Sequence, residues 1–456
     1  MSLSLPIDFQ NEMKNQLKEE YPDFINALNQ IAPTSIRVNP SKNYVVEENF
    51  EKIDWCPNSY YLQNRPIFTL DPTFHAGGYY VQEAASMWIS RIIENEVGIN
   101  KPLRVLDLCA APGGKSTLLL SLIPKESLII CNEVIKNRSH ILKDNLIKWG
   151  FSNVIVSNHD VDDFEEFENY FDIVLVDAPC SGEGMFRKDP SSIQEWSFEN
   201  IENCSLRQRN ILEKTLPLVK NGGILIYSTC TYNDNENENS AQFILDSKKF
   251  KLLKINDNRL VDKGIGHQCY PHKVKGEGFY FAAFIKINQI DQNYSIKKTI
   301  KQGKWLDITK NEFKIISNWV ENAENFTFKK NYDGIIYGWL KIFNNDLEII
   351  EKALKKWSPI MEVGNIKGND LIPAHTLALS NHLSSKIQNI EVDKINALKF
   401  LKKETFKLPQ DKIGWNTISY KNLKLGWVKN LGNRFNNYLP NSSRIIMDID
   451  YEQIIS

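Results

Sequence analysis

The sequence predicts an α/β protein built on a doubly wound sheet of seven strands, and three observations carry that prediction. Short apolar runs recur along residues 103–285, bounded by turn-forming residues, as is typical of strands buried on both faces of a parallel sheet. Helix-type patterns separate most of these runs. Polar loops follow several of them, which is where ligands bind in open α/β sheets.

Bulk properties narrow the class of protein. A chain of 456 residues suggests two to four domains, and an apolar fraction of 42% excludes disorder. No run approaches the roughly 18 apolar residues of a membrane span, and the start lacks the plan of a signal peptide. Seven cysteines without a Cys-x-x-Cys pair indicate neither a disulfide framework nor a zinc site, so we expect no metal and a cytoplasmic location.

Charge is distributed unevenly. Residues 1–290 carry 30 basic and 38 acidic side chains, a net charge of −8, whereas residues 291–456 carry 25 and 18, a net charge of +7. A basic half favours a polyanionic substrate, and the alternative is ordinary surface variation.

The first 73 residues predict a small α/β cap domain, with a helix over 6–20 and a strand from Thr34 that Pro40 ends. Residues 74–86 join glycines and aromatics to a helix that runs to about Glu94. This segment either packs on the sheet edge or closes over a ligand.

A cofactor site is predicted at the first three strands. Residues 103–117 read as strand, glycine loop and helix, which lets backbone approach a nucleoside-bearing cofactor. The next strand, 128–132, ends at Glu133, placed to bind a ribose or to sit at the start of helix 134–149. We expect Ile141, Leu142, Leu146 and Trp149 to form the apolar face of that helix and Gly150 to end it. Asp160 follows the strand at 153–157, placed for an adenine amino group or as a plain turn residue.

Two cysteine loops follow the next two predicted strands. Strand 171–176 leads into Asp177-Ala-Pro-Cys180-Ser-Gly-Glu-Gly184, and strand 223–227 leads into Ser228-Thr-Cys230-Thr231. A helix over about 204–220 separates them, and strands at 252–255 and 278–285 complete the sheet.

The rest of the chain predicts a polar linker at 288–300, helices near 310–321 and 346–357, and a basic, β-rich end. Residues 391–434 hold 10 basic and 4 acidic residues among aromatics. Such a mixture either binds unpaired nucleic acid or covers a core made by the aromatics. The aromatics are Phe400, Phe406, Trp415, Tyr420 and Trp427.

The two cysteine loops suggest covalent chemistry on an electron-poor ring. Carbon 5 of cytosine becomes nucleophilic once a thiolate adds to carbon 6, an acid near nitrogen 3 stabilises the charge, and a base must later remove the carbon 5 proton. Cys230, Asp177 and Cys180 are residues of these types. The alternative for any cysteine is a small buried hydrophobe, which we favour for Cys56, Cys131, Cys204 and Cys269, while Cys109 would line the cofactor loop.

These motifs resemble those of the Nop/Sun family of RNA cytosine-5 methyltransferases. The resemblance is carried by Cys109 to Lys115, by the two cysteine loops, and by Arg37-Val-Asn39 and Tyr80 to Ser86. The tail, with His375 to Leu379 and Gly426 to Tyr438, is similar to the bacterial RsmF-like branch.

The resemblance implies a class I Rossmann-like methyltransferase domain over 74–288, a connecting α/β domain over 289–365 and a PUA-like RNA-binding domain over 366–456. It implies that Cys230 is the nucleophile, that Cys180 assists product release and that Asp177 contacts both base and cofactor. S-adenosylmethionine would lie against Cys109, Ala110, Ala111, Pro112, Gly113, Gly114, Lys115, Glu133 and Asp160. The implied substrate is 16S ribosomal RNA, naked or in the 30S subunit, bound by a monomer.

Other functions remain open. A DNA cytosine-5 methyltransferase would pair a Pro-Cys loop with Glu-Asn-Val, which does not occur in this sequence. An exocyclic amino methyltransferase would carry an aromatic where Cys180 stands. A methyltransferase for tRNA or another RNA, or a silent ribosome-assembly factor, are further alternatives, and the retention of Cys180, Cys230 and Asp177 argues against the silent factor.

Overall fold

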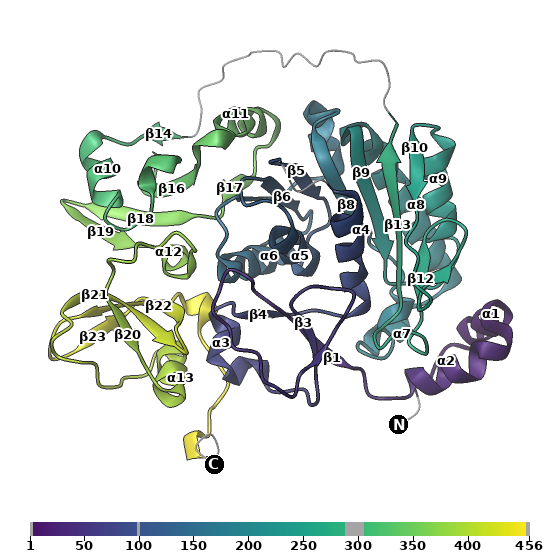
Figure 1. Ribbon diagram of the computed structural model, residues 1–456, viewed down its shortest axis with the longest axis horizontal. Coiled ribbons are helices and arrows are strands. Elements are labelled where there is room, and N and C mark those ends of the chain that lie inside the picture. The colour runs from purple at the N-terminus through teal and green to yellow at the C-terminus, as the bar shows by residue number, and fades with distance from the viewer. Residues whose placement is uncertain (1–2, 98–100, 288–304, 453–456) are drawn as a thin grey trace.

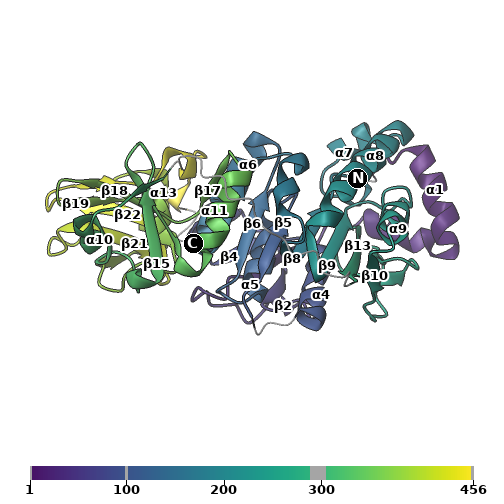
Figure 2. The same cartoon turned by 90° about the horizontal axis from the view of Figure 1, so that it is seen from above.

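The structure is a computed structural model that describes residues 3–97, 101–287 and 305–452 (Figure 1). A large central sheet lies between the N-terminal helices at one end and the tail at the other (Figure 2). The predicted linker at 288–300 lies outside the described residues. Within the described ranges, no helix is long and apolar enough to cross a membrane.

The N-terminal region is a pair of helices followed by a four-stranded antiparallel sheet of order β2-β3-β1-β4. The predicted helix and strand are both present, and a second helix follows the first. Its elements are α1 (Ile7–Leu17), the 3-10 helix η1 (Lys18–Glu20), α2 (Tyr21–Leu28), β1 (Thr34–Val38), β2 (Glu51–Lys52), β3 (Ser59–Leu62), η2 (Phe68–Leu70), α3 (Pro72–His75) and β4 (Tyr79–Val81).

The central sheet contains all seven predicted strands and three more. Its order is β11-β12-β13-β9-β8-β5-β6-β7-β17, with β10 paired to β13. The strands are β5 (Arg104–Asp107), β6 (Leu128–Asn132), β7 (Val154–Ser157), β8 (Phe171–Asp177), β9 (Val219–Thr229), β10 (Phe250–Leu253), β11 (Val261–Asp262), β12 (His267–Cys269), β13 (Phe279–Lys286) and β17 (Trp357–Pro359).

Five strands, β5 to β9, run parallel, and the side of the sheet on which new strands are added reverses between β5 and β8. After β5 it moves outward through β6 and β7, then returns to place β8 on the other side of β5. The loops that follow β5 and β8 therefore diverge, and such a switch point is where open α/β sheets bind ligands.

Helices cover both faces of this sheet because successive side chains of a strand point to opposite faces. Ile173 and Leu175 of β8 pack toward one face, whereas Val174 and Val176 pack toward the other. The first face holds α4 (Ile89–Glu96), α5 (Gly114–Leu122) and α6 (Lys136–Trp149). The second holds η4 (Val161–Phe167), α8 (Phe198–Thr215), α9 (Glu238–Asp246) and α11 (Asn344–Ala353). Shorter helices are η3 (Ala85–Trp88), η5 (Glu183–Met185), α7 (Ser191–Glu195) and η6 (Leu216–Leu218).

Two local predictions need correction. In α6, Leu142, Leu146 and Trp149 are buried as predicted, but Ile141 is 53% exposed, because the helix turns it away from the sheet. The helix predicted over 204–220 is α8 followed by η6, and the strand after it begins at Val219 rather than at Gly223. Gly150 ends α6 with a left-handed φ of 85°, as predicted.

The tail forms two small sheets, and one of its strands joins the central sheet. β17 pairs antiparallel with β7, so this part of the tail completes the central sheet. The limit predicted at residue 365 falls inside β18, whose hairpin partner is β19, and the domain limits remain a prediction. The remaining elements are β14 (Leu306–Asp307), α10 (Lys310–Ile316), η7 (Ala323–Asn325), β15 (Phe326–Lys330), β16 (Ile335–Leu340), η8 (Lys341–Phe343), β18 (Glu362–Lys367), β19 (Asp370–Pro373), α12 (His375–Leu379), β20 (Asn389–Glu391), α13 (Lys394–Lys402), β21 (Gly414–Tyr420), β22 (Leu423–Asn430), β23 (Phe435–Asn437) and η9 (Asn441–Ser443).

Candidate active site

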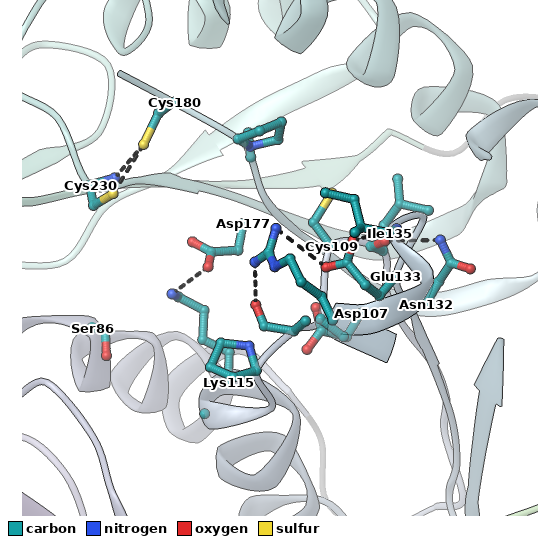
Figure 3. Close-up of a pocket in the computed structure, with 18 of the residues that line it drawn as sticks. Ser86, Asp107, Cys109, Lys115, Asn132, Glu133, Ile135, Asp177, Cys180 and Cys230 are labelled. Atoms are coloured by element: carbon teal, nitrogen blue, oxygen red, sulfur yellow. Dashed lines mark hydrogen bonds and ion pairs between the residues drawn. The ribbon is translucent and has the colours of Figure 1, made fainter. Parts of the chain in front are cut away.

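The two cysteine loops meet at the carboxyl ends of β8 and β9. These strands are parallel neighbours, with Asp177 in register with Ser228. The thiol sulfurs of Cys180 and Cys230 lie 3.1 Å apart, and the backbone N–H of Cys230 donates to the Cys180 sulfur at 3.3 Å (Figure 3). Both cysteines line one cavity of about 860 Å³. The sequence placed both at this edge of the sheet, and the structure adds their contact.

The contact between the thiols affects the ionisation of Cys180. The hydrogen bond with Cys230, burial and the negative charge of a Cys230 thiolate together raise the pKa of Cys180 well above its usual value. Cys180 therefore keeps its proton at neutral pH. It can donate that proton as a hydrogen bond to the Cys230 sulfur, which keeps the two side chains directed at one another.

Asp177 is held by groups from both sides of the cavity. Its Oδ2 lies 2.7 Å from Lys115 Nζ, and its Oδ1 accepts a hydrogen bond from Ser228 Oγ at 2.8 Å. Burial alone would lower the pKa of Lys115, but the charge and hydrogen bond of Asp177 outweigh it and the net shift is upward. Lys115 is therefore a cation, and it links the glycine loop to the Cys180 loop.

The glycine loop connects β5 to α5, and Asp107 lies at its start. Gly113 adopts φ +112°, a conformation that favours glycine. Asp107 is fully buried, and Ser116 Oγ donates to its Oδ2 at 2.6 Å. Its Oδ1 has no hydrogen-bond partner among the described residues. Burial raises the pKa of Asp107 to about 7. This carboxyl group lines the cavity and can still accept a ligand's donor.

Glu133 and Asp160 also line the cavity, as predicted, and each has a local structural role as well. Oε1 of the buried Glu133 accepts the N–H of Ile135 at 2.9 Å, while Oε2 lies 3.6 Å from Arg138 Nη1. The exposed Asp160 accepts the N–H of Asp162 at 3.3 Å and caps η4. The structure thus leaves room for both alternatives that the sequence raised.

The other predicted loop residues lie around the same cavity. Cys109, Ala110, Ala111, Pro112, Gly114 and Lys115 line it, while Gly113 lies behind them against α6. Burial is the largest cause of the raised pKa of Cys109, which fits a lining residue rather than a reactive one. Cys56, Cys131, Cys204 and Cys269 are buried away from the cavity lining, as expected.

Sequence reasoning missed several lining residues. Glu277 is 1% exposed, pairs with Arg187 at 3.0 Å, and has its pKa raised mainly by burial. Arg207 and Asn210 reach the cavity from α8. Phe279 also lines the cavity, although its segment, 278–285, was expected only as a strand that completes the sheet. These residues come from elements that are distant in the sequence, so no local sequence pattern could have predicted that they line the same cavity.

The N-terminal domain fixes the glycine loop through Arg37. This guanidinium is 1% exposed and donates to the Gly114 carbonyl at 3.2 Å and to Thr117 Oγ1 at 2.6 Å, both in the first turn of α5. It lies 4.8 Å from the Trp149 ring centroid. Burial lowers the pKa of Arg37 to about 10, so it remains charged at neutral pH. The Arg37-Val-Asn39 segment therefore holds α5, the helix after the glycine loop, in place.

The tail aromatics divide between the two alternatives left open. Phe400 and Trp427 are fully buried and belong to the cores of the two tail sheets. Phe406, Trp415 and Tyr420 are only half-buried. The Lys429 ammonium lies 5.5 Å from the Trp415 ring centroid, so a basic and aromatic surface remains around β21 and β22.

Comparison with known families agrees with this architecture. Three family models match in order along the chain: the N-terminal domain of 16S rRNA methyltransferase RsmF over 5–84, 16S rRNA methyltransferase RsmB/F over 99–285, and the methyltransferase RsmF PUA domain over 387–445. The chain belongs to the RsmF family of 16S rRNA methyltransferases. The PUA match agrees with the RNA-binding end that the sequence predicted.

Relatives of the RsmF family match over most of their length. The ribosomal RNA small subunit methyltransferase F of Shewanella loihica is 28% identical over 93% of each chain. That of Pectobacterium atrosepticum is 32% identical over 63% of this chain and 64% of its own. A methyltransferase homologue from Pyrococcus horikoshii is 29% identical with a TM-score of 0.54, covering 62% of this chain and 96% of that one. The structure of NSun6 from Pyrococcus horikoshii with SFG, at 21% identity and a TM-score of 0.52, shares the fold.

Family membership makes this chain an RNA methyltransferase that uses S-adenosylmethionine. The cavity fits that cofactor. Its carboxylates, Asp107 with an unpaired oxygen and Glu133 nearby, suit cationic and hydroxyl groups, and the apolar Val134 and Ile135 suit an adenine face.

Proposed function

We propose that this enzyme methylates carbon 5 of cytosine in small-subunit ribosomal RNA through a covalent bond between Cys230 and the ring. The observation that supports this reaction is the pair of thiols, 3.1 Å apart, in the cavity that also contains the cofactor loop. Methylation of an amino group or a ribose hydroxyl has no use for two adjacent thiols.

Cys230 is the nucleophile in this proposal. Its thiolate adds to carbon 6, forming an S–C6 bond and giving carbon 5 enamine character. S-adenosylmethionine supplies an electrophilic methyl group. Asp177, fixed by Lys115 and Ser228, would lie near ring nitrogen 3, where a proton given to that nitrogen would neutralise the negative charge that develops in the ring.

Cys180 acts after methyl transfer. The carbon 5 proton must leave before the S–C6 bond can break and release the product. Two causes of the raised Cys180 pKa come from Cys230; once the Cys230 sulfur is bonded to the ring, its negative charge is gone and it is a weaker hydrogen-bond acceptor. Cys180 would then ionise more readily, at the stage when a base is needed.

The cofactor would occupy the side of the cavity formed by Cys109 to Lys115. Glu133 Oε2 would accept bonds from the ribose hydroxyls, since its other oxygen is already used by Ile135. Asp160 would meet the adenine amino group, and Asp177 would border both cofactor and base.

The substrate class follows from the relatives, which are named for the small ribosomal subunit. The +7 charge of residues 291–456 and the placement of Lys429 beside Trp415 support RNA binding by the tail. We propose that a monomer in the cytoplasm acts on 16S RNA, either naked or in the 30S subunit. Bisulfite mapping of ribosomal RNA from cells with and without the protein would identify the modified cytosines, and an unchanged map would redirect the proposal to tRNA or another RNA.

A denaturing gel with labelled substrate RNA and cofactor tests the mechanism. Cys230→Ala should give neither methylated product nor adduct. Cys180→Ala should accumulate an RNA–protein species that survives denaturation, because attack proceeds and elimination is blocked. An adduct for Cys230→Ala, or none for a folded Cys180→Ala, would contradict the assignment.

A further inference from the structure

The two cysteine loops hold each other through a pair of buried carboxylates, one from each loop. Glu183 belongs to the Cys180 loop and is 1% exposed. Its Oε2 accepts three hydrogen bonds from the Cys230 loop: from Thr231 Oγ1 at 2.6 Å, from the Tyr232 N–H at 2.8 Å and from the Asn233 N–H at 3.1 Å. Its Oε1 accepts from Trp196 Nε1 at 2.8 Å. One carboxylate from the first loop thus orders three successive residues of the second.

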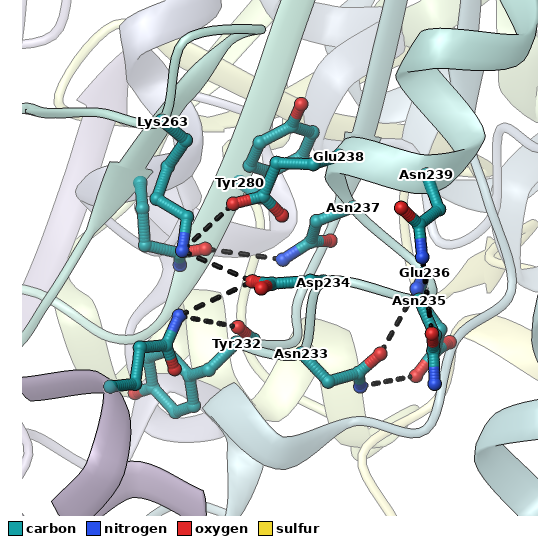
Figure 4. A network of polar contacts seen from close by, with 12 residues as sticks. Tyr232, Asn233, Asp234, Asn235, Glu236, Asn237, Glu238, Asn239, Lys263 and Tyr280 are labelled. Carbon is teal, nitrogen blue, oxygen red and sulfur yellow. Dashed lines mark hydrogen bonds and ion pairs between the residues drawn. The ribbon is translucent and has the colours of Figure 1, made fainter.

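Glu236 makes the reciprocal contact from the Cys230 side. It is fully buried, and its Oε2 accepts the N–H of Ser181, the residue after Cys180, at 2.9 Å. The same oxygen accepts Gln208 Nε2 at 2.8 Å, and that amide also donates to the Pro179 carbonyl at 3.0 Å. Oε1 of Glu236 accepts Asn233 Nδ2 at 2.8 Å, a contact visible in Figure 4. We call Glu183 and Glu236 the carboxylate clasp.

Direct bonds between the loops lie within this clasp. The Gly184 N–H donates to the Cys230 carbonyl at 2.8 Å, and the Ser181 and Thr231 hydroxyls lie 3.0 Å apart. The residues on both sides of the thiol pair are therefore fixed, which determines the 3.1 Å separation of the sulfurs. Neither Glu183 nor Glu236 is among the described residues that line the cavity, so neither would touch the substrate.

We propose that Glu183 and Glu236 are positioning residues whose specific task is to keep Cys180 within reach of the ring bonded to Cys230. The inference rests on the proposed function, because it concerns the release step. Loosening the clasp should impair release more than attack. Attack needs only Cys230 and the ring, whereas release also needs Cys180 to reach the carbon 5 proton of the ring that Cys230 holds. A misplacement of about 1 Å is enough to cost about 10²-fold in rate.

Carboxylates suit this task because they only accept hydrogen bonds. Glu236→Gln or Glu183→Gln would keep one acceptor oxygen but place an NH₂ donor at the other position, where it would face a donor that now points at a carboxylate oxygen, so one contact of each residue would become repulsive. Glu238→Gln is a matched control from the same segment. Glu238 pairs with Lys263 at 2.8 Å on the other side of the loop (Figure 4), and no contact with the Cys180 loop is found among the described residues.

The experiment compares the full-length wild type with Glu236→Gln, Glu183→Gln, Glu238→Gln and Cys180→Ala in the denaturing gel. The two clasp variants should lose about 10²-fold in turnover and accumulate the RNA–protein species, as Cys180→Ala does, while cofactor affinity measured by calorimetry stays within about twofold of wild type. Thr231→Val removes one of the three donors to Glu183 Oε2, together with the hydroxyl contacts to Ser181 and Asn233, and serves where a clasp variant does not fold. It should shift the fraction trapped in the same direction.

A chemical measurement of the thiol separation makes the test independent of RNA. Diamide, an azo compound, takes one hydrogen from each of two thiols, becoming a hydrazine as the S–S bond forms. Cys180 and Cys230 should cross-link readily in wild type and Glu238→Gln, and at least tenfold more slowly in Glu236→Gln, as followed by peptide mass spectrometry.

The outcomes separate the two proposals. If Cys180→Ala traps RNA but the clasp variants release product and cross-link like Glu238→Gln, the positioning role is wrong and the proposed function stands. If Cys180→Ala traps nothing, the proposed mechanism fails, whereas slower cross-linking in the clasp variants would still show that the carboxylates set the thiol separation.

Discussion

The two halves of the active-site cavity differ in how completely their polar groups are bonded within the protein. In the cysteine half, the two thiols contact each other, and the clasp carboxylates behind them bond to N–H and hydroxyl groups of the two loops. In the cofactor half, Asp107 keeps an unpaired buried oxygen, Asp160 uses one oxygen to cap η4, and Glu133 Oε2 has only a 3.6 Å ion pair with the half-exposed Arg138. In the proposed mechanism, the first half holds the reacting groups, which must not move. In the second half, a ligand is needed to supply the remaining hydrogen bonds.

This difference has an energetic side. A buried polar atom without a partner costs free energy until a ligand supplies the bond, so the cofactor half stores a cost that binding can relieve. The cysteine half gains its order within the protein before any substrate arrives, which is the preorganisation that catalysis requires.

The ion pair between Lys115 and Asp177 links the two halves, and removing it should have the largest effect on activity. Lys115→Met would leave Asp177 without its cation, so the carboxylate would lose its fixed position beside both base and cofactor. We expect kcat/KM for RNA methylation to fall about 10²-fold. Lys136→Met, an exposed lysine at the start of α6, should stay near wild type. Equal activity of the two variants would mean that the halves work independently.

The proposed contact between Glu133 and the cofactor ribose should give the next largest effect, and this effect should be confined to cofactor binding. Glu133→Ala should weaken S-adenosylmethionine binding by about 1–3 kcal/mol, the range for hydrogen bonds to a charged group. Calorimetry would measure this against Glu165→Ala, which removes an exposed acid from η4. Unchanged affinity in a folded Glu133→Ala protein would leave Glu133 with only its role beside Ile135.

The unpaired carboxyl of Asp107 should show itself in the pH dependence of stability. Burial raises its pKa from the usual 3.8 to about 7, so the folded protein holds this proton to higher pH than the unfolded chain does. The stabilising contribution is fully present below about pH 4 and is lost as the pH rises through about 7. Between about pH 5 and 7 the free energy of unfolding should fall relative to that of Asp107→Asn, by at most about 1.4 kcal/mol per pH unit. Urea unfolding of the cofactor-free wild type and Asp107→Asn proteins at several pH values would measure this difference. Parallel plots of unfolding free energy against pH for the two proteins would show that Asp107 is ionised throughout this range.

Much of the site could be predicted from local sequence. The strands that end at Asp107, Asn132 and Asp177 are continuous apolar runs, and the carboxyl ends of parallel strands meet at one edge. That rule alone brings Cys180, Cys230, Glu133 and the glycine loop to one cavity. The roles of these residues in catalysis stay predictions until the variants are measured.

Other features depended on contacts between distant parts of the chain. Strand β17 joins the central sheet by pairing Trp357 with Ser157, two hundred positions earlier. The local sequence around residue 357 does not predict which strand it pairs with. The fate of the tail aromatics was likewise decided by packing: Trp427 fills a core, whereas Trp415 stays half-buried beside Lys429.

The sequence by itself determined seven strands of the central sheet, the edge of that sheet that carries the site, and the residue types in the loops after the parallel strands, because these depend on local periodicity and on the direction of parallel strands. Only the tertiary structure decided that two thiols fifty residues apart lie 3.1 Å from each other and that Glu183 and Glu236 fasten their loops together. The reason is geometric. A periodic pattern says which face or edge a residue occupies, but the distance between two side chains is set by the register of neighbouring strands and by the hydrogen bonds that close the loops between them.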